Sequence, residues 1–184
     1  MKTFKKIKLG FHTNWTTVYV GWRGLGVLSP WPDQWIKWPP LIDTDEISEY
    51  AEERLSSSQN AKENELIINL LSLDLYIEPR VVILDILEQL SNLDRGNPAF
   101  ELRKWRLVLL EEFLKSLPEG PVDALTDMTE FWLNFKSITE DCPHVVQGIG
   151  NSITTDEYYT DEYLQQEIRR HQAWIEKERK EIKN

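Results

Sequence analysis

From Asp43 onward, apolar residues recur every three or four positions, which is the spacing that gives a helix one buried face. Helices are predicted at about residues 43–55, 65–73, 79–93, 98–117, 122–135 and 160–182. Pro79, Pro98 and the stretch Pro118–Pro121 lie where proline suits the start of a helix or a break between two. Because short turns join these segments and no strands alternate with them, the pattern is typical of an all-α fold.

The first forty residues are harder to assign. Phe4, Ile7, Leu9 and Phe11 nearly alternate with lysines, which allows one short strand or hairpin. The segment Thr16–Val20 is rich in β-branched residues, yet Thr13 or Asn14 is equally suited to cap a short helix there. Four prolines and three tryptophans in Pro30–Pro40 predict an aromatic loop, because proline interrupts regular elements.

The sequence therefore predicts one domain over residues 1–184, a compact array of antiparallel helix pairs with at most a short N-terminal strand or hairpin. It comprises an irregular segment (1–40), a helical core (43–136), a loop (140–159) and a C-terminal helix (160–182). Every residue of Glu176–Glu181 is charged, so these last turns are expected to project into solvent.

Composition narrows the class of protein. Apolar residues make up 41% of the chain and charged residues 28%, as in ordinary globular proteins. No apolar run approaches the roughly 20 residues that span a bilayer, and the N-terminal residues lack the apolar core of a secretion signal. Cys142 is the single cysteine, so no internal disulfide is expected. We expect a cytoplasmic monomer that does not contact a membrane.

The net charge of −10 is unevenly distributed: residues 1–40 carry +5, residues 41–165 carry −17 and residues 166–184 carry +2. An acidic body of this kind repels phosphate backbones, so nucleic acid is not an expected partner. The same field accelerates association with a basic protein. The simpler interpretation is that the charge keeps the protein soluble.

Residues with catalytic potential are sparse. Of the three histidines, His12 has no acidic neighbour in sequence, and His171 lies on the apolar stripe of the last helix, where it is expected to be a packed side chain. Cys142 and His144 flank a proline, which makes contact between the thiol and the imidazole fortuitous, and this short loop identifies no third group that would orient the imidazole. The glycines of Gly21–Gly26 do not follow a nucleotide-binding pattern. We therefore expect no catalytic residue, no metal site and no cofactor, and a protein that is not an enzyme.

The segment Asp156–Glu162 combines four carboxylates with two tyrosines just before the last helix. Tyrosines provide rigid contact area, and carboxylates pair with arginine and lysine. The candidate partner-binding residues are Glu140, Asp141, Asp156, Glu157, Tyr158, Tyr159, Asp161 and Glu162. Alternatively, Thr160 caps the helix, the adjacent acids complement its dipole, and the tyrosines pack on the body. The tryptophan-rich segment is a second candidate surface.

Three core segments, Ile47–Leu55, Glu65–Leu73 and Leu102–Leu110, resemble a bacterial family labelled domain of unknown function 2247. The proline at 121, the acid at 123 and the aromatic pair Phe131–Trp132 fit the same pattern. The resemblance covers about residues 11–138, while the insert at 30–40 and residues 140–184 depart from it. It implies a helical bacterial protein of the cytoplasm. Small acidic proteins of such families often resemble immunity proteins encoded beside a secreted toxin.

Charge, missing catalytic motifs and this resemblance together lead to one leading hypothesis. The chain is expected to be an immunity protein that binds a cognate toxin domain, in particular a basic nuclease, and neutralises it by electrostatic and steric blockade. The alternative is a bacterial enzyme or a regulator that binds a small molecule. That alternative requires a buried carboxylate with a raised pKa in a deep pocket.

Overall fold

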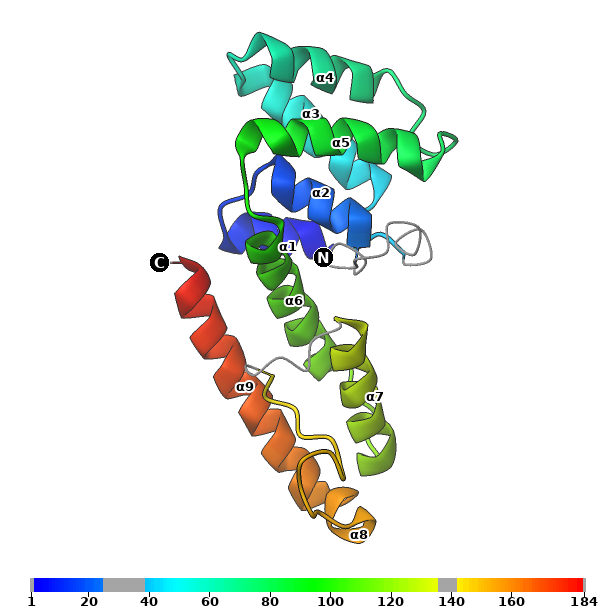
Figure 1. Cartoon of the computed structure of the whole chain (residues 1–184), viewed down its shortest axis with the longest axis vertical. Coiled ribbons are helices and arrows are strands. Elements are labelled where there is room, and N and C mark those ends of the chain that lie inside the picture. The colour runs from blue at the N-terminus through cyan, green and yellow to red at the C-terminus, as the bar shows by residue number, and fades with distance from the viewer. Residues whose placement is uncertain (1, 25–38, 136–141, 184) are drawn as a thin grey trace. The chain divides into compact units, whose positions relative to one another are not determined.

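The structure, a computed structural model, describes residues 2–24, 39–135 and 142–183 (Figure 1). These residues form nine helices and contain no β-strand, which confirms the prediction of an all-α fold. They group into two compact units, Met1–Trp105 and Arg106–Asn184, which are described separately below as the first and second units. Most of the tryptophan-rich segment Pro30–Pro40 lies outside the described residues. Among the described helices, none is both long and apolar enough to span a bilayer.

The first unit holds five whole helices and residues 98–105 of a sixth, α6. Helix α2 packs against α5, and α4 packs against both α3 and α5 (Figure 1). The helices are α1 (Thr3–Gly10), α2 (Trp15–Arg23), α3 (Thr44–Ser57), α4 (Ala61–Leu71), α5 (Arg80–Asp94) and α6 (Pro98–Lys115). Their contacts make the antiparallel helix pairs that the apolar periodicity predicts.

The expected N-terminal strand is wrong, because Thr3–Gly10 is helix α1. Phe4 and Ile7 are both buried, and their spacing of three residues places them on one helical face. Leu9 is 73% exposed, so it does not belong to the buried set that suggested alternation. The near-alternating pattern therefore mixed core and surface residues.

Helix α2 forms despite its β-branched residues. The Asn14 side chain accepts a hydrogen bond from the Thr17 amide at 2.9 Å, and the Thr17 hydroxyl accepts one from the Asn14 amide at 3.1 Å. This capping box satisfies amides that the first turn leaves without partners. Burial then outweighs local propensity, because Thr16, Thr17 and Val18 are all fully buried. Of the two alternatives for this segment, the capped helix is the one that forms.

Several buried polar groups of the first unit form hydrogen bonds with one another. Glu101 accepts hydrogen bonds from the Thr17 hydroxyl at 2.5 Å and from the Lys104 ammonium at 2.8 Å. Glu63 accepts one from the Trp15 indole at 2.8 Å and forms an ion pair with Arg54 at 2.7 Å. Such satisfaction matters because a buried charge without partners is strongly destabilising.

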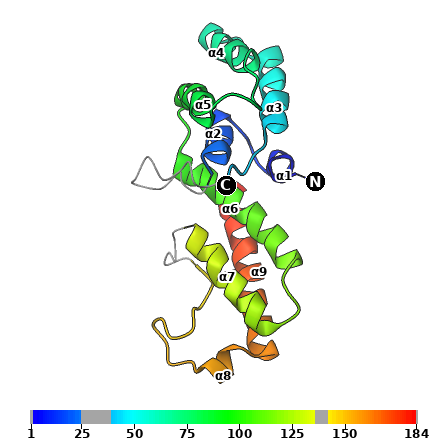
Figure 2. The same cartoon turned by 90° about the vertical axis from the view of Figure 1, so that its right-hand side faces the viewer.

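The second unit contains residues 106–115 of α6, then α7 (Pro121–Asn134), the short α8 (Thr155–Tyr158) and α9 (Asp161–Lys183). Helix α7 lies beside α9, and α8 lies at the beginning of α9 (Figure 2). The buried centre of this part of the unit consists of Ala124, Leu125, Met128, Tyr158 and Leu164.

The last turns of α9 do not simply project into solvent, which corrects the expectation for Glu176–Glu181. The Glu178 side chain is 6% exposed and pairs with Arg106 of α6 at 3.4 Å. Arg179 pairs with Glu111 of the same helix. This charged run therefore includes residues whose ion pairs attach α9 to α6. The sequence alone cannot distinguish such residues from charged residues that face solvent.

Candidate functional site

The structure separates the predicted partner-binding residues by exposure. Glu140 and Asp141 lie outside the described residues. The four acids Asp156, Glu157, Asp161 and Glu162 are exposed on α8 and the first turn of α9. Tyr159 is half-buried, but Tyr158 is only 2% exposed and belongs to the buried centre of the second unit. The four acidic side chains are thus exposed to solvent, whereas the ring of Tyr158 is part of the core.

Helix capping explains why some residues of the segment Asp156–Glu162 are present. Thr154 and Glu157 form a reciprocal capping box at the start of α8, and the Thr160 hydroxyl accepts a hydrogen bond from the Tyr163 amide at 3.2 Å. The side chains of Asp156, Asp161 and Glu162 form no ion pair or hydrogen bond with any described residue. Local structure therefore explains Glu157 and Thr160, and it leaves three carboxylates without a local role beyond the helix dipole.

Further acids belong to the same unit. Residues 116–168 contain eleven acidic residues and one basic residue, Lys136, which lies outside the described residues. Helix α7 contributes Asp123, Asp127 and Glu130, whose spacing places them on one helical face. The first turns of α7 and α9 lie toward the same end of the unit as α8 (Figures 1 and 2). We call Asp123, Asp127, Glu130, Asp156, Asp161 and Glu162 the anionic surface.

A small cavity adjoins the anionic surface. It has a volume of about 190 Å³ and lies among α7, the segment 142–153 and α8. Its lining residues are Thr126, Thr129, Glu130, Val146, Gln147, Tyr158 and Tyr159. The cavity therefore brings two predicted residues, Tyr158 and Tyr159, together with α7 residues that the sequence did not single out.

Tyr158, one of the residues that line this cavity, has an unusual hydroxyl group. It is buried and forms no hydrogen bond with any described residue. Burial raises the pKa of Tyr158 to about 12, while the nearby Thr129 side chain opposes that shift without reaching hydrogen-bond geometry. A buried hydroxyl without a partner is destabilising, so its presence needs an explanation.

Asn151 fixes the segment that forms one wall of the cavity. Its side-chain oxygen accepts hydrogen bonds from the amides of Gly148 at 3.1 Å and Ile153 at 3.2 Å. Its side-chain nitrogen donates to the carbonyls of Val146 at 2.8 Å and Ile149 at 3.0 Å. Gly148 has a φ of 75°, a left-handed conformation that favours glycine. The wall residues Val146 and Gln147 are therefore held in place by local hydrogen bonds.

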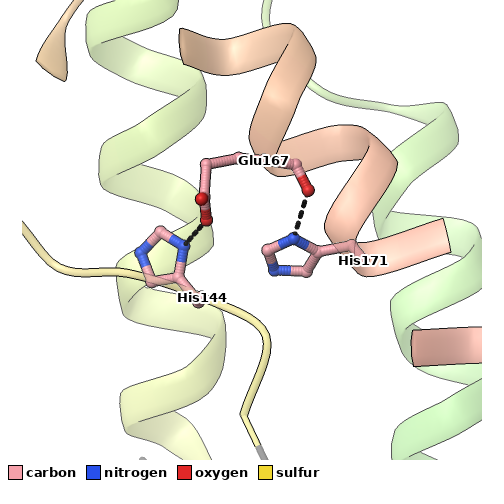
Figure 3. A group of neighbouring side chains, drawn as sticks. All are labelled: His144, Glu167 and His171. Carbon is pink, nitrogen blue, oxygen red and sulfur yellow. Dashed lines mark hydrogen bonds and ion pairs between the residues drawn. The ribbon is translucent and has the colours of Figure 1, made fainter. Parts of the chain in front are cut away.

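Behind the cavity, His144 connects Thr129 to Glu167. The Thr129 hydroxyl lies 2.8 Å from His144 Nε2, and His144 Nδ1 lies 3.1 Å from Glu167 Oε2. Figure 3 shows the Glu167 carboxylate reaching His144 while the Glu167 carbonyl oxygen meets His171. A carboxylate opposite Nδ1 favours a proton on Nδ1, and the Thr129 hydroxyl that faces Nε2 donates its own proton to the Leu125 carbonyl at 2.9 Å.

Glu167 is fully buried but remains an anion. Burial acts to raise the pKa of its carboxyl group, but hydrogen bonds from His144, from the Val145 amide at 3.2 Å and from Arg170 at 2.5 Å hold that pKa below its usual value. A general acid requires the opposite shift. Glu167 is thus built to orient His144 and to compensate Arg170.

His171 uses both ring nitrogens within the core, in agreement with the packed role expected for it. Its Nε2 accepts a hydrogen bond from the Trp132 indole at 2.9 Å, and its Nδ1 donates to the Glu167 carbonyl at 2.7 Å. Burial lowers the pKa of His171 to about 4, so the ring is neutral at neutral pH.

His144, Glu167 and His171 each place one potential metal-ligating atom within 4.8 Å of the others. A metal ion needs ligand lone pairs that are free to coordinate it. Here hydrogen bonds already occupy both nitrogens of each imidazole and both oxygens of the carboxylate. Hydrogen bonding therefore accounts for this cluster without a metal ion.

The Thr129 hydroxyl contacts the His144 imidazole, which contacts the Glu167 carboxylate. Catalytic nucleophiles are activated by the same order of groups. Thr129 lies inside α7, where its hydroxyl also lies 2.9 Å from the Leu125 carbonyl. Backbone amides in that position are committed to the helix, so they provide no pair of free donors for an oxyanion. The arrangement favours a positioning role.

In the first unit, Glu46 is a buried carboxylate whose pKa is raised by burial, as the enzyme alternative requires. It also lines a cavity of about 390 Å³ with Lys5 and Lys8. Its two oxygens accept hydrogen bonds from the amides of Lys5 at 3.3 Å and Asp43 at 3.5 Å. Glu46 therefore ties α1 to the start of α3, and this structural role accounts for its burial.

Sequence reasoning missed the series Thr129–His144–Glu167, because its members are separated by 15 and 23 residues and lie on a helix, a loop and another helix. The acid missing near His144 comes from α9. A weak signal was present, since Glu167 is a charged residue at a position that the helical period places close to the apolar stripe.

Residues 2–179 match a family whose description reads "Uncharacterized protein conserved in bacteria (DUF2247)". The match confirms the resemblance carried by the core motifs, and it extends that resemblance through the insert at residues 30–40 and past residue 138. No curated protein and no solved structure matches the chain.

Proposed function

The chain belongs to the bacterial family DUF2247, and from this premise we propose that it is an immunity protein that binds and neutralises a cognate toxin domain. Its partner is a basic protein domain, and a nuclease is the toxin class that fits best. The inhibitor acts by occupying the partner's surface rather than by chemistry.

One observation carries the proposal: five of the six acids of the anionic surface are exposed, Asp127 is half-buried, and the described residues supply them with no counter-charge. Its six carboxylates form no ion pair with any described lysine or arginine. By contrast, Glu178 and Glu167 of the same unit are paired with arginines. Unpaired carboxylates concentrated on one part of a unit produce a potential that steers a basic partner and opposes an anionic one.

The mechanism follows from the chemistry of nuclease toxins in general. Such enzymes hold the phosphate backbone of their substrate with lysine and arginine side chains. A carboxylate surface offers those cations an alternative partner, since arginine and lysine form charge-assisted hydrogen bonds with carboxylates. Binding there blocks the substrate both electrostatically and sterically.

The first test is growth rescue. A gene for a secreted protein with a toxin domain is expected beside the gene for this chain, and that domain should stop bacterial growth when it is expressed alone. Co-expression of this chain should restore growth. Growth arrest that persists when the folded chain is present would contradict the proposal.

The second test addresses the electrostatic mechanism. The association rate of the purified pair should fall about tenfold when the salt concentration rises from about 50 to 300 mM. The double variant Asp156→Lys with Glu162→Lys should slow association by a similar factor, while Glu88→Lys, an exposed position on α5, serves as the matched control. Association that ignores both salt and the double variant would rule out steering by this surface.

A further inference from the structure

We propose that exposed apolar side chains at the connection between α4 and α5 form a docking surface for an amphipathic, basic helix of another protein (Figure 1). The surface consists of Tyr76, Ile77, Val81 and Val82, and we call it the apolar surface. The inference goes beyond the proposed function, because this surface belongs to the first unit and shares no residue with the anionic surface.

The apolar surface concentrates exposed side chains in a short stretch of chain. Ile77 is 80% exposed and Tyr76 is 75% exposed, and the two valines that follow within the next five residues are exposed as well. Single exposed apolar residues are normal on a protein, whereas a concentrated group indicates contact with another molecule. The other large apolar side chains exposed among the described residues stand singly in the sequence: Leu9, Ile68, Val122, Leu133 and Ile149.

Local hydrogen bonds hold the apolar surface in place. The Asp74 carbonyl accepts hydrogen bonds from the amides of Ile77 at 3.0 Å and Glu78 at 2.9 Å. The Asp74 side chain accepts one from the Tyr76 amide at 3.1 Å, and Leu75 of the same turn is buried. The exposed residues are thus presented by an ordered turn and by the first turn of α5, so docking requires little loss of backbone freedom.

Acidic residues flank the apolar surface. Asp74 and Glu78 lie in the turn before α5, and Asp85 lies four residues after Val81 on the same helical face. None of these three acids forms an ion pair with a described residue. The surroundings of the apolar side chains are therefore negative.

The cations close to the apolar surface are already engaged. Arg80 is the one basic residue of α5, and its guanidinium group donates to the Trp22 carbonyl and lies 5.7 Å from the centre of the Trp22 ring. Asp45, which accepts a hydrogen bond from the Tyr76 hydroxyl, is paired with Lys2. Cations that complement the flanking acids must therefore come from a partner.

This charge selects the kind of partner. A second copy of this chain would bring the same acids together across a twofold contact, and like charges oppose such an association. Anionic lipid headgroups and phosphate backbones are repelled in the same way. A helix with leucine-like side chains on one face and lysine or arginine beside them complements both the apolar side chains and the acids. Packed along α5, it meets Val81 and Asp85 one turn apart.

The experiment is a titration of the full chain, enriched in nitrogen-15, with an acetylated leucine–lysine peptide of about 15 residues in which leucine recurs at helical spacing. Saturable backbone amide shifts are expected at Ile77, Val81 and Val82. One control peptide has the same composition in an order that removes the apolar helical face, and another has glutamate in place of lysine. Neither control should produce saturable shifts at these residues.

Matched variants separate apolar docking from the general attraction of a basic peptide. Val81 is the second residue of α5, and Val122 is a similarly exposed valine at the second residue of α7. The double variant Ile77→Ser with Val81→Ser should raise the dissociation constant of the peptide about tenfold. The double variant Val122→Ser with Leu133→Ser should leave it unchanged. Both variants should keep the wild-type melting temperature, because all four side chains are exposed.

The inference is overturned if the peptide produces saturable shifts only at the anionic surface, if the glutamate peptide binds equally well, or if Ile77→Ser with Val81→Ser binds like the wild type. Two further outcomes would assign the apolar surface to another occupant and overturn the inference as well. Self-association in sedimentation that this variant abolishes would assign it to a second copy. Peptide binding that requires replacement of residues 25–38 by a flexible linker would assign it to that segment of this chain.

Discussion

Acidification from pH 7 to pH 5 is expected to destabilise the second unit because His171 remains neutral when folded. Burial lowers the pKa of His171 to about 4, while its pKa in the unfolded chain is near 6.5. Between these two values the unfolded state binds a proton that the folded state does not. The stabilising contribution is therefore complete above about pH 7 and is lost as the pH falls toward 4.

The magnitude follows from the difference in pKa. At about 1.4 kcal/mol for each pH unit, the shift corresponds to ~3 kcal/mol over the whole interval, of which ~2 kcal/mol is lost by pH 5. The groups that face His171 are His144, Glu167, Arg170 and Trp132. Glu167 is ionised throughout this range because its pKa is lowered, so it adds little to the change between pH 7 and pH 5.

The assay is urea unfolding followed by circular dichroism at pH 7 and pH 5, for the wild type and for His171→Phe. The variant loses the hydrogen bond with Trp132 and is less stable at both values, but its change with pH should be smaller than that of the wild type by ~2 kcal/mol. His12→Gln, at an exposed histidine, is the matched control and should behave like the wild type. An identical pH dependence in the wild type and His171→Phe would refute the reasoning.

Two further outcomes are expected. Gly21→Ala should destabilise the first unit by about 1–3 kcal/mol, because the added Cβ would lie 2.3 Å from the buried Trp105 ring; an unchanged melting temperature would show that this contact is looser than described. Burial raises the pKa of Cys142 to about 11, so iodoacetamide at pH 8 should alkylate it on the order of a hundredfold more slowly than a free cysteine analogue. An alkylation rate equal to that of the analogue would contradict the burial of this thiol.

Much of the helical architecture follows from local sequence. Asp43 caps α3 by accepting a hydrogen bond from the Glu46 amide at 2.9 Å, at the residue where the predicted helix begins. Helix α6 begins at Pro98, and α7 has Pro121 in its first turn. These helix starts depend on residues that are close in sequence, so they can be predicted from the sequence alone.

The N-terminal segment shows why the rest could not be predicted. In Thr3–Gly10 only Phe4 and Ile7 are buried, which is too few positions to distinguish a helical from an extended period. In α2, the β-branched residues favour a strand locally, and the partners that bury them come from α5 and α6. Tertiary contacts outweigh propensity in both segments.

The candidate site also has a part that the sequence could predict and a part that only the structure shows. Its acids and tyrosines were visible as a composition of one segment, whereas the cavity and the buried series behind it join α7, the loop at 142–153 and α9. Even the exposure of two adjacent tyrosines differs, since Tyr158 is core and Tyr159 is half-buried. No feature of the sequence indicated that two adjacent tyrosines would differ in burial.

The sequence by itself determined an all-α chain, the starts of its central helices and an excess of carboxylates before the last helix, because helical period, capping and net charge are local or additive properties. Only the tertiary structure decided that Thr129 meets His144, that α9 supplies its carboxylate, and that the Tyr158 hydroxyl is buried without a partner. Those relations depend on side chains from distant segments, and packing sets them rather than the spacing of residues along the chain.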